Sequence, residues 1–229
     1  MMSFKISEWI FAILFMLCSF LSIADETEPE LLNADELGAF LKKIETSLSD
    51  ITSLETKFRQ EKHISILSEA VESTGILYFQ KPKSIRFEIV TPYHSILVTN
   101  GKSVAQFELI DGTWTKLRTG GAGVILLVTD QIASWLQGNF EEQMETFEIS
   151  AKKGAHHLFL RPTDPKFAEF IQRIELTFSD DLSVITRLEI HEPSDDYTVI
   201  EFEETRQNPL NDKDLFKTSG KRPFLVLKP

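Results

Sequence analysis

A two-residue alternation of apolar and polar side chains recurs along most of this chain, and it constrains the fold more than any other feature. Ile85, Phe87 and Ile89, for example, are separated by charged residues. The same alternation appears in three later stretches, residues 173–178, 184–190 and 200–203. Successive side chains of a β-strand point to opposite faces, so each stretch can bury one face and leave the other in water. The pattern therefore predicts antiparallel strands that are covered on one side only.

Turn-forming residues separate these stretches at distances that are typical of hairpins. There are five such signals: Asn100-Gly101, Asp111-Gly112, Lys153-Gly154, residues 179–181 and residues 193–196. Asn-Gly and Asp-Gly favour the tight turns that join neighbouring antiparallel strands. Regular short strands joined in this way predict a meander.

A helical period replaces the alternation near the start of the chain. Asn33 is a candidate N-cap, and Asp35 and Glu36 place negative charge in the first turn. Six apolar residues then follow at helical spacing: Leu37, Phe40, Leu41, Ile44, Leu48 and Ile51. We expect an amphipathic helix that packs on the core, with binding to a partner as the less favoured interpretation.

A second apolar segment interrupts the strand pattern in the middle of the chain. Residues 119–123 are rich in glycine, and the apolar run Val124–Val128 follows them. Ile132, Trp135 and Leu136 then recur at a spacing that a helix places on one side. Two interpretations remain open: a helix that plugs one end of the sheet, or a lid over a cavity that moves on its flanking glycines.

The first 24 residues have the features of a cleaved signal peptide. An apolar run reaches Ile23, and Ser22-Ile23-Ala24 offers small residues before a cut. We therefore expect cleavage after Ala24 and one exported domain over residues 25–229. An uncleaved anchor is an alternative, because Glu8 weakens the positive start. Lipidation at Cys18 is another, which the bulky residues before it disfavour.

Composition excludes several functional classes. The net charge is −11, which argues against nucleic acid and against electrostatic attachment to anionic lipid. Cleavage would remove the only Cys, so we expect neither a disulfide nor thiol chemistry. The 18 Phe residues suit a large apolar interior, since Phe buries much area without a polar group that needs a partner.

Motifs for catalysis are absent from the sequence. There is no G-x-S-x-G segment, and the glycines of residues 119–123 are not followed by Gly-Lys-Ser or Gly-Lys-Thr. His156 and His157 are adjacent, so in a strand they point to opposite faces and cannot bind one metal together. His63, His94 and His191 are isolated. We therefore expect a binding or transport protein without metal or cofactor, rather than an enzyme.

Five stretches, taken in order, resemble motifs of the outer-membrane lipoprotein carrier (LolA) family. Residues 53–60 (SLETKFRQ) resemble a first strand with the pattern S-x-x-x-x-F-x-Q, and residues 75–82 (GILYFQKP) resemble G-x-L-x-x-x-[RK]-P. The others are Ile85–Glu88 (F-R-W-E in the family, with Phe87 in place of Trp), the hairpin from Thr91-Pro92 to Asn100–Lys102, and a closing pattern over residues 202–216. The resemblance covers roughly residues 33–217.

The resemblance implies both a fold and a function. The fold is mainly β, an unclosed antiparallel β-barrel capped by the N-terminal helix and a helical lid. The function is that of a monomeric periplasmic chaperone and carrier, which shields lipoprotein acyl chains in an apolar cavity. It would receive lipoproteins from an inner-membrane ABC transporter and pass them to an outer-membrane receptor. The alternative within this fold is a periplasmic sensor that binds lipid or lipoprotein as a regulatory signal.

Candidate site residues follow from the strand faces and from the family. The expected cavity lining is Ile85, Phe87, Ile89, Leu176, Phe178, Leu188 and Phe202, each of which has packing under a helix as its alternative. The expected lid is Val124, Ile125, Leu126, Leu127, Ile132, Trp135 and Leu136. Lys81 stands before Pro82, where the family often has Arg. We expect Lys81 to hold the empty form closed by donating to lid carbonyls or loop oxygens, with a solvated lysine as the alternative.

Overall fold

The computed structural model describes residues 30–118, 122–209, 212–220 and 223. The chain divides into two compact units, Met1–Glu30 and Leu31–Pro229, and the description below concerns the second. The expected signal peptide, its cleavage site at Ala24 and Cys18 lie outside the described residues. Among the residues that are described, no helix has the length and hydropathy needed to cross a membrane.

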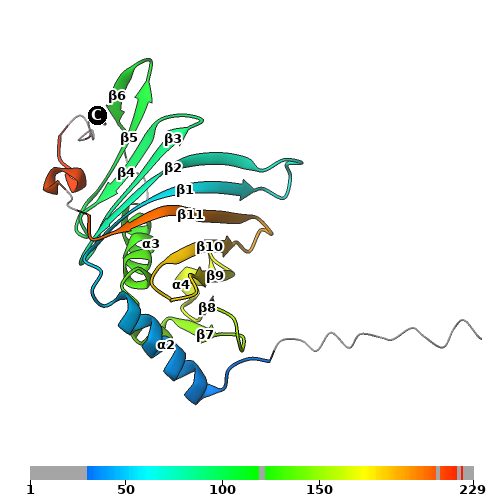
Figure 1. Ribbon diagram of the computed structural model, residues 1–229. Coiled ribbons are helices and arrows are strands. Elements are labelled where there is room, and N and C mark those ends of the chain that lie inside the picture. The colour runs from blue at the N-terminus through cyan, green and yellow to red at the C-terminus, as the bar shows by residue number, and fades with distance from the viewer. Residues whose placement is uncertain (1–29, 119–121, 210–211, 221–222, 224–229) are drawn as a thin grey trace, which may run out of the picture. The chain divides into compact units, whose positions relative to one another are not determined.

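Eleven strands form one antiparallel sheet in the described part of the chain (Figure 1). The first six are β1 (Ser53–His63), β2 (Val71–Gln80), β3 (Ser84–Thr91), β4 (Ser95–Thr99), β5 (Val104–Ile110) and β6 (Thr113–Lys116). The others are β7 (Phe147–Ser150), β8 (His157–Pro162), β9 (Arg173–Phe178), β10 (Ile185–His191) and β11 (Tyr197–Gln207). Each group is a meander, and β1 pairs with β11 to join them. β6 and β7 are the two edges, so the sheet is not closed. These features confirm the predicted fold class.

All five turn signals fall between strands, as predicted. Asp111 and Gly112 both have positive φ, 49° and 74°, which is the conformation of a type I′ hairpin turn. The Asn100 side chain accepts hydrogen bonds from the backbone N–H groups of Lys102 and Ser103, at 3.1 and 3.0 Å. Asn and Asp side chains favour turns because they can bond to nearby backbone in this way.

The predicted N-terminal helix is α2 (Ala34–Leu48), and it begins where the sequence indicates. Asn33 Oδ1 accepts from the Glu36 N–H at 3.0 Å, and Glu36 Oε2 accepts from the Asn33 N–H at 2.9 Å. This capping box satisfies two N–H groups that would otherwise lack partners. The buried face consists of Leu37, Leu41, Ile44 and Leu48. The helix ends at Leu48, so Ile51 is buried from the loop that follows and not from the helix.

The second predicted helix is α3 (Ala122–Trp135), within the predicted lid segment. Gly138, just beyond it, has φ of +76°, and a Cβ there would lie 2.9 Å from the Glu45 Cα. The chain that leaves α3 therefore packs directly on the backbone of α2. Three short helical turns complete the described part: η1 (Glu141–Glu145), α4 (Pro165–Ala168) and η2 (Lys213–Phe216).

The main core lies between one face of the sheet and the two long helices. It contains buried side chains from α2 and α3 together with side chains from β1, β2, β3 and β7–β11. Both helices therefore cover the same face of the sheet. Trp135 of α3 meets Phe147 of β7 edge-on, with ring centroids 6.2 Å apart. Phe140 meets Phe178 at 6.0 Å in the same manner.

A second, smaller cluster shows that the expectation of cover on one side only is wrong for part of the sheet. Apolar residues of β2, β4 and β5 are buried on the other face under Leu215 and Phe216 of η2. Burial raises the pKa of Tyr78, one of them, to about 12. Arg86 is also buried, with its guanidinium donating to Glu88 Oε2 at 2.9 and 3.0 Å. A period of two identifies a strand but does not reveal that a distant C-terminal segment covers its polar face.

Gly75 of β2 is a position where only hydrogen fits. It pairs with Phe58 of β1, and an added Cβ would lie 2.0 Å from the Glu88 carbonyl oxygen and 2.5 Å from the Phe58 ring. Phe58 in turn stacks on Phe87, with centroids 4.1 Å apart. Because Gly75 has no Cβ, the Phe58 ring can lie close to the backbone there and stack on Phe87 on the core face.

We predict opposite effects for two glycine substitutions. Gly75→Ala should lower the free energy of unfolding by about 2–3 kcal/mol, because backbone and ring must move to admit a methyl group. Gly38→Ala should raise it by about 0.5–1 kcal/mol, since Gly38 is an exposed helical residue with nothing within 4 Å of its added Cβ. Urea denaturation followed by circular dichroism measures both. Equal stabilities for the two variants would contradict the account of Gly75.

Candidate functional site

The seven residues expected to line a cavity all belong to the main core. Ile85, Leu176, Phe178 and Leu188 are buried in it, whereas Phe87, Ile89 and Phe202 are partly buried and pack against it. The structure therefore brings them together on the face that α2 and α3 cover. In this arrangement the space between sheet and helices is filled by protein side chains, which is the packed alternative stated for each residue.

The expected lid is a helix, and its two halves differ in burial. Trp135 and Leu136 are buried in the core, and Ile132 packs against it. Ile125 and Leu126 are only half-buried, and Leu127 is exposed. The side chain of Val124 lies outside the described set. The C-terminal half of α3 thus provides the cover, while the N-terminal half keeps apolar side chains partly in water.

Two polar contacts attach α3 and the turn that follows it to the β2–β3 turn. Lys83 Nζ lies 2.8 Å from Asp130 Oδ2, and Gln137 Nε2 donates to the Pro82 carbonyl at 2.9 Å. Lys83 is half-exposed, so its ion pair is a modest interaction in water. Sequence reasoning missed both contacts. The sequence did carry a signal for the ion pair: Lys83 is a basic residue in the same turn as Lys81, and Asp130 is an acidic residue in the predicted lid segment.

Lys81 itself reaches a loop and not the lid. Its Nζ donates to the Ser49 carbonyl at 3.0 Å, at the C-terminal end of α2. The acceptor is the C-cap carbonyl of α2, and the expected role of Lys81 in holding the empty form closed stays a prediction. Lys81 therefore connects the β2–β3 turn to α2, and its neighbours Pro82 and Lys83 connect the same turn to α3. A single turn holds both helices.

An open groove runs along the other side of α2, with a volume of about 980 Å³. Its lining includes apolar Leu32, Phe40 and Leu182 together with charged Lys43 and Asp181. Hydrogen bonds from the hydroxyls of Ser179 and Ser183 lower the pKa of the Asp181 carboxyl to about 2. Acidic and basic residues both line this groove, so its charge does not favour one class of ligand.

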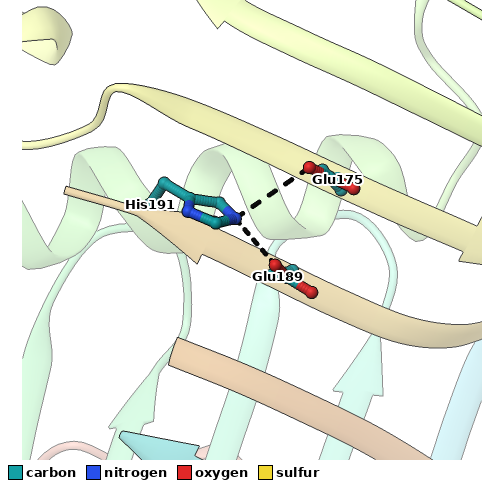
Figure 2. A group of neighbouring side chains, drawn as sticks. All are labelled: Glu175, Glu189 and His191. Carbon is teal, nitrogen blue, oxygen red and sulfur yellow. Dashed lines mark hydrogen bonds and ion pairs between the residues drawn. The ribbon is translucent and has the colours of Figure 1, made fainter. Parts of the chain in front are cut away.

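A cluster of titratable groups lies on the face of the sheet opposite the helices (Figure 2). Glu175 of β9 and Glu189 of β10 are directly paired across the strands, and His191 Nε2 lies 2.7 Å from Glu189 Oε1 and 3.9 Å from Glu175 Oε1. Their ligand atoms lie within 4.8 Å of one another, a spacing that suits a metal ion. The expectation from the sequence that His191 is isolated is therefore wrong.

Arginines already compensate the charge of this cluster. Arg173 Nε lies 2.8 Å from Glu175, and Arg187 Nη2 lies 2.6 Å from Glu189. Arg173 Nη2 is also 3.1 Å from His191 Nε2, the nitrogen that a metal would take. Two carboxylates directly opposite each other would repel, and the two guanidinium groups offset that repulsion. We therefore assign the cluster to the pairing of β9 and β10.

Comparison with known proteins places the chain in a family. The family model described as "Outer membrane lipoprotein carrier protein LolA" matches residues 49–219. An outer-membrane lipoprotein carrier protein of Edwardsiella ictaluri (strain 93-146) is 22% identical over 132 residues, which are 56% of this chain and 65% of that protein. One from Yersinia pestis is 24% identical over 149 residues, which are 63% of this chain and 70% of that protein.

Solved structures give more distant likenesses. A LolA superfamily protein from Nitrosomonas europaea has a TM-score of 0.44 and 11% identity, over 79% of this chain and 96% of that one. The lipoprotein LppX of Mycobacterium tuberculosis has a TM-score of 0.45 and 10% identity, over 78% of this chain and 99% of that one. Since the family model spans well over half of the chain, the protein belongs to the LolA family of outer membrane lipoprotein carrier proteins.

Proposed function

We propose that this protein is a periplasmic carrier that binds lipoprotein acyl chains between its sheet and the helices α2 and α3. The observation that carries the proposal is the arrangement of α3, whose apolar residues cover the sheet face while a few polar contacts at one turn hold it there. Membership of the LolA family supports the same role. The cargo route would run from an inner-membrane ABC transporter to an outer-membrane receptor, with the protein acting as a monomer.

The physical need for such a carrier is the cost of exposing acyl chains to water. Each methylene group contributes about 0.8 kcal/mol when it is buried, so a long chain exposed in an aqueous compartment costs on the order of 10 kcal/mol. A shielding surface must lack unsatisfied polar groups. The face formed by Ile85, Phe87, Leu176, Leu188 and Phe202 meets this condition, because its side chains are hydrocarbon throughout.

Release of the cargo depends on what covers this face when it is empty. Trp135 and Leu136 fill it in the structure, so cargo would replace protein–protein contacts and not water. Binding is then an exchange between two apolar covers, and its net affinity is the difference between them. The proposal needs no cofactor, metal or covalent step. It includes export through the signal peptide of residues 1–24.

Identification of the bound cargo tests the proposed function directly. Protein isolated from the periplasm should carry lipoprotein or acyl lipid in native mass spectrometry, and acceptor vesicles that contain the receptor should empty it. A stable complex with an anti-sigma factor, without transfer, would instead support a sensor. Hydrolysis of an added lipid would support an enzyme. Either result would overturn the carrier.

We predict that Trp135 reports the exchange of covers. Its indole is buried, and its Nε1 has no hydrogen-bond partner among the described residues. An environment-sensitive lipid probe should bind the native protein and change Trp135 fluorescence as α3 moves. The measurement uses Trp114→Phe in protein without residues 1–24, because Trp114 lies in the second cluster under η2 and Trp9 would add its own emission. If the native protein does not bind the probe, the proposed lipid-binding cavity is refuted.

We predict that Lys81→Leu loads cargo more tightly and releases it more slowly than the natural protein. The substitution removes the hydrogen bond to Ser49 and frees the β2–β3 turn from α2. The same turn holds the α3 region through Lys83 and Pro82, so freeing the turn from α2 loosens α3 and shifts the population towards the open form. Lys81→Arg keeps a donor and should be tolerated. Loading and transfer equal to those of the natural protein would make Lys81 an ordinary surface lysine.

We predict that Lys83 and Asp130 act as a coupled pair on the closed lid. Lys83→Ala and Asp130→Ala should each raise the affinity for the lipid probe by about two- to fivefold, the range that an exposed ion pair allows. The double variant should add little beyond either single change, because the pair is already lost. Lys42→Ala is the matched control, since Lys42 pairs with Glu45 on the exposed side of α2 at 2.6 Å. An equal gain in the control would refute a specific role for Lys83.

A further inference from the structure

The hairpin formed by β1 and β2 extends beyond its neighbour in the sheet. Pairing between β2 and β3 begins only at Thr74 and Thr91, so residues 71–73 have no partner on the β3 side. β1 continues to His63, and residues 64–70 join the two strands. Figure 1 shows this hairpin projecting past the tips of the adjacent hairpins.

The tip of the hairpin is apolar and exposed. Ile66 is 88% exposed, Leu67 50% and Val71 48%, all within six residues. The other large apolar side chains that are exposed in the described ranges occur singly along the chain: Leu31, Tyr93, Ile110, Leu127, Met144 and Phe170. Single exposed apolar residues are ordinary on protein surfaces, whereas a group of them marks a surface that interacts.

The tip is also held in a defined conformation. The Leu67 N–H donates to the Ile64 carbonyl at 2.8 Å, which closes a turn, and the Ser65 N–H donates to Asp196 Oδ1 at 2.8 Å. Ile66 and Leu67 therefore stand on a turn that satisfies part of its own backbone. Entry into an apolar medium requires such internal satisfaction, because no water is available there.

The form of the tip favours a lipid surface over a folded protein as its partner. A stable protein interface buries about 800 Å² on each partner, and one turn with three apolar side chains is far smaller. A bilayer accepts a narrow protrusion, since its apolar region deforms around the inserted side chains. Amphipathic elements bind in this way by burying apolar residues at the boundary between headgroups and acyl chains.

Charge around the tip indicates which lipids it would meet. Glu69, Glu72, Asp195 and Asp196 are near the tip in the chain or in contact with it, and Lys62 is already paired with Glu192. Carboxylates are repelled by the negative potential of anionic lipids. We propose that the 64–71 tip docks the protein reversibly on zwitterionic membrane surface by inserting Ile66 and Leu67. This docking requires no bound cargo and does not rest on the carrier role.

Co-sedimentation of the intact protein with phosphatidylcholine vesicles tests the proposal. The Ile66→Ser/Leu67→Ser variant should partition onto the vesicles about tenfold less, because burial of only two methylene equivalents already accounts for that factor. Phe170→Ser is the matched control, since Phe170 is exposed to a similar extent at 55% and should leave partitioning unchanged. Replacement of a third of the lipid by phosphatidylglycerol should weaken binding by the natural protein.

A direct probe of insertion completes the test. Ile66→Cys, in a Cys18→Ser background and labelled with a polarity-sensitive fluorophore, should shift to the blue when vesicles are added. Absence of binding by the natural protein, or equal binding by the double serine variant, would overturn the proposal. A concentration-dependent dimer that the double variant abolishes, without vesicle binding, would also overturn it and assign the tip to a second copy of the chain.

Discussion

Burial of the apolar face that extends across β1–β3 and β7–β11 is the interaction on which the rest of the structure depends. A sheet with one apolar face cannot leave that face in water, and two edge strands that do not meet leave it without the closure that a complete barrel would provide. α2 and α3 supply the missing cover. The strength of that cover sets both the stability of the empty protein and the affinity for anything that replaces it.

The two covering helices differ in how firmly they are attached. α2 has a capping box and a continuous buried face from Leu37 to Leu48, and the chain after α3 packs on its backbone at Gly138. α3 is buried only in its C-terminal half and is attached to the β2–β3 turn through its own Asp130 and through Gln137, just beyond its end. A fixed helix and a lightly attached one on the same apolar face provide what an exchange of covers requires. The proposed function uses this difference and no chemical step.

Much of the fold could be predicted because it is encoded locally. Alternation identifies the strands around Ile85 and Leu176, and Asn33 with Glu36 identifies the start of α2 before any tertiary contact is known. The cover of Arg86 by Leu215 could not be predicted in this way, since it joins residues far apart in sequence. The juxtaposition of Glu175 and Glu189 was hidden for the same reason, because only the strand register shows that these two carboxylates are opposite each other.

The candidate site was predictable in its apolar part and not in its polar part. Burial stabilises apolar residues such as Leu188, so the two-residue alternation of apolar and polar side chains is enough to assign them to the core face. The polar contacts of a turn depend on which donor reaches which acceptor, and Lys81 and Lys83 are two residues apart with different helices as partners. The family resemblance indicates Lys81 as the residue that contacts the expected lid, whereas in the structure Lys83 makes the ion pair with α3.

The central claim is that α3 and an acyl chain compete for the same apolar face, and a reversible tether tests it most directly. Cysteines at Lys83 and Asp130, in a chain with Cys18→Ser, can be joined by a short cleavable bismaleimide, with the two single-cysteine variants as controls. The account predicts that the tethered protein does not load a lipid probe or lipoprotein, and that cleavage of the linker restores loading. Equal loading before and after cleavage would show that α3 need not move, and would contradict the account.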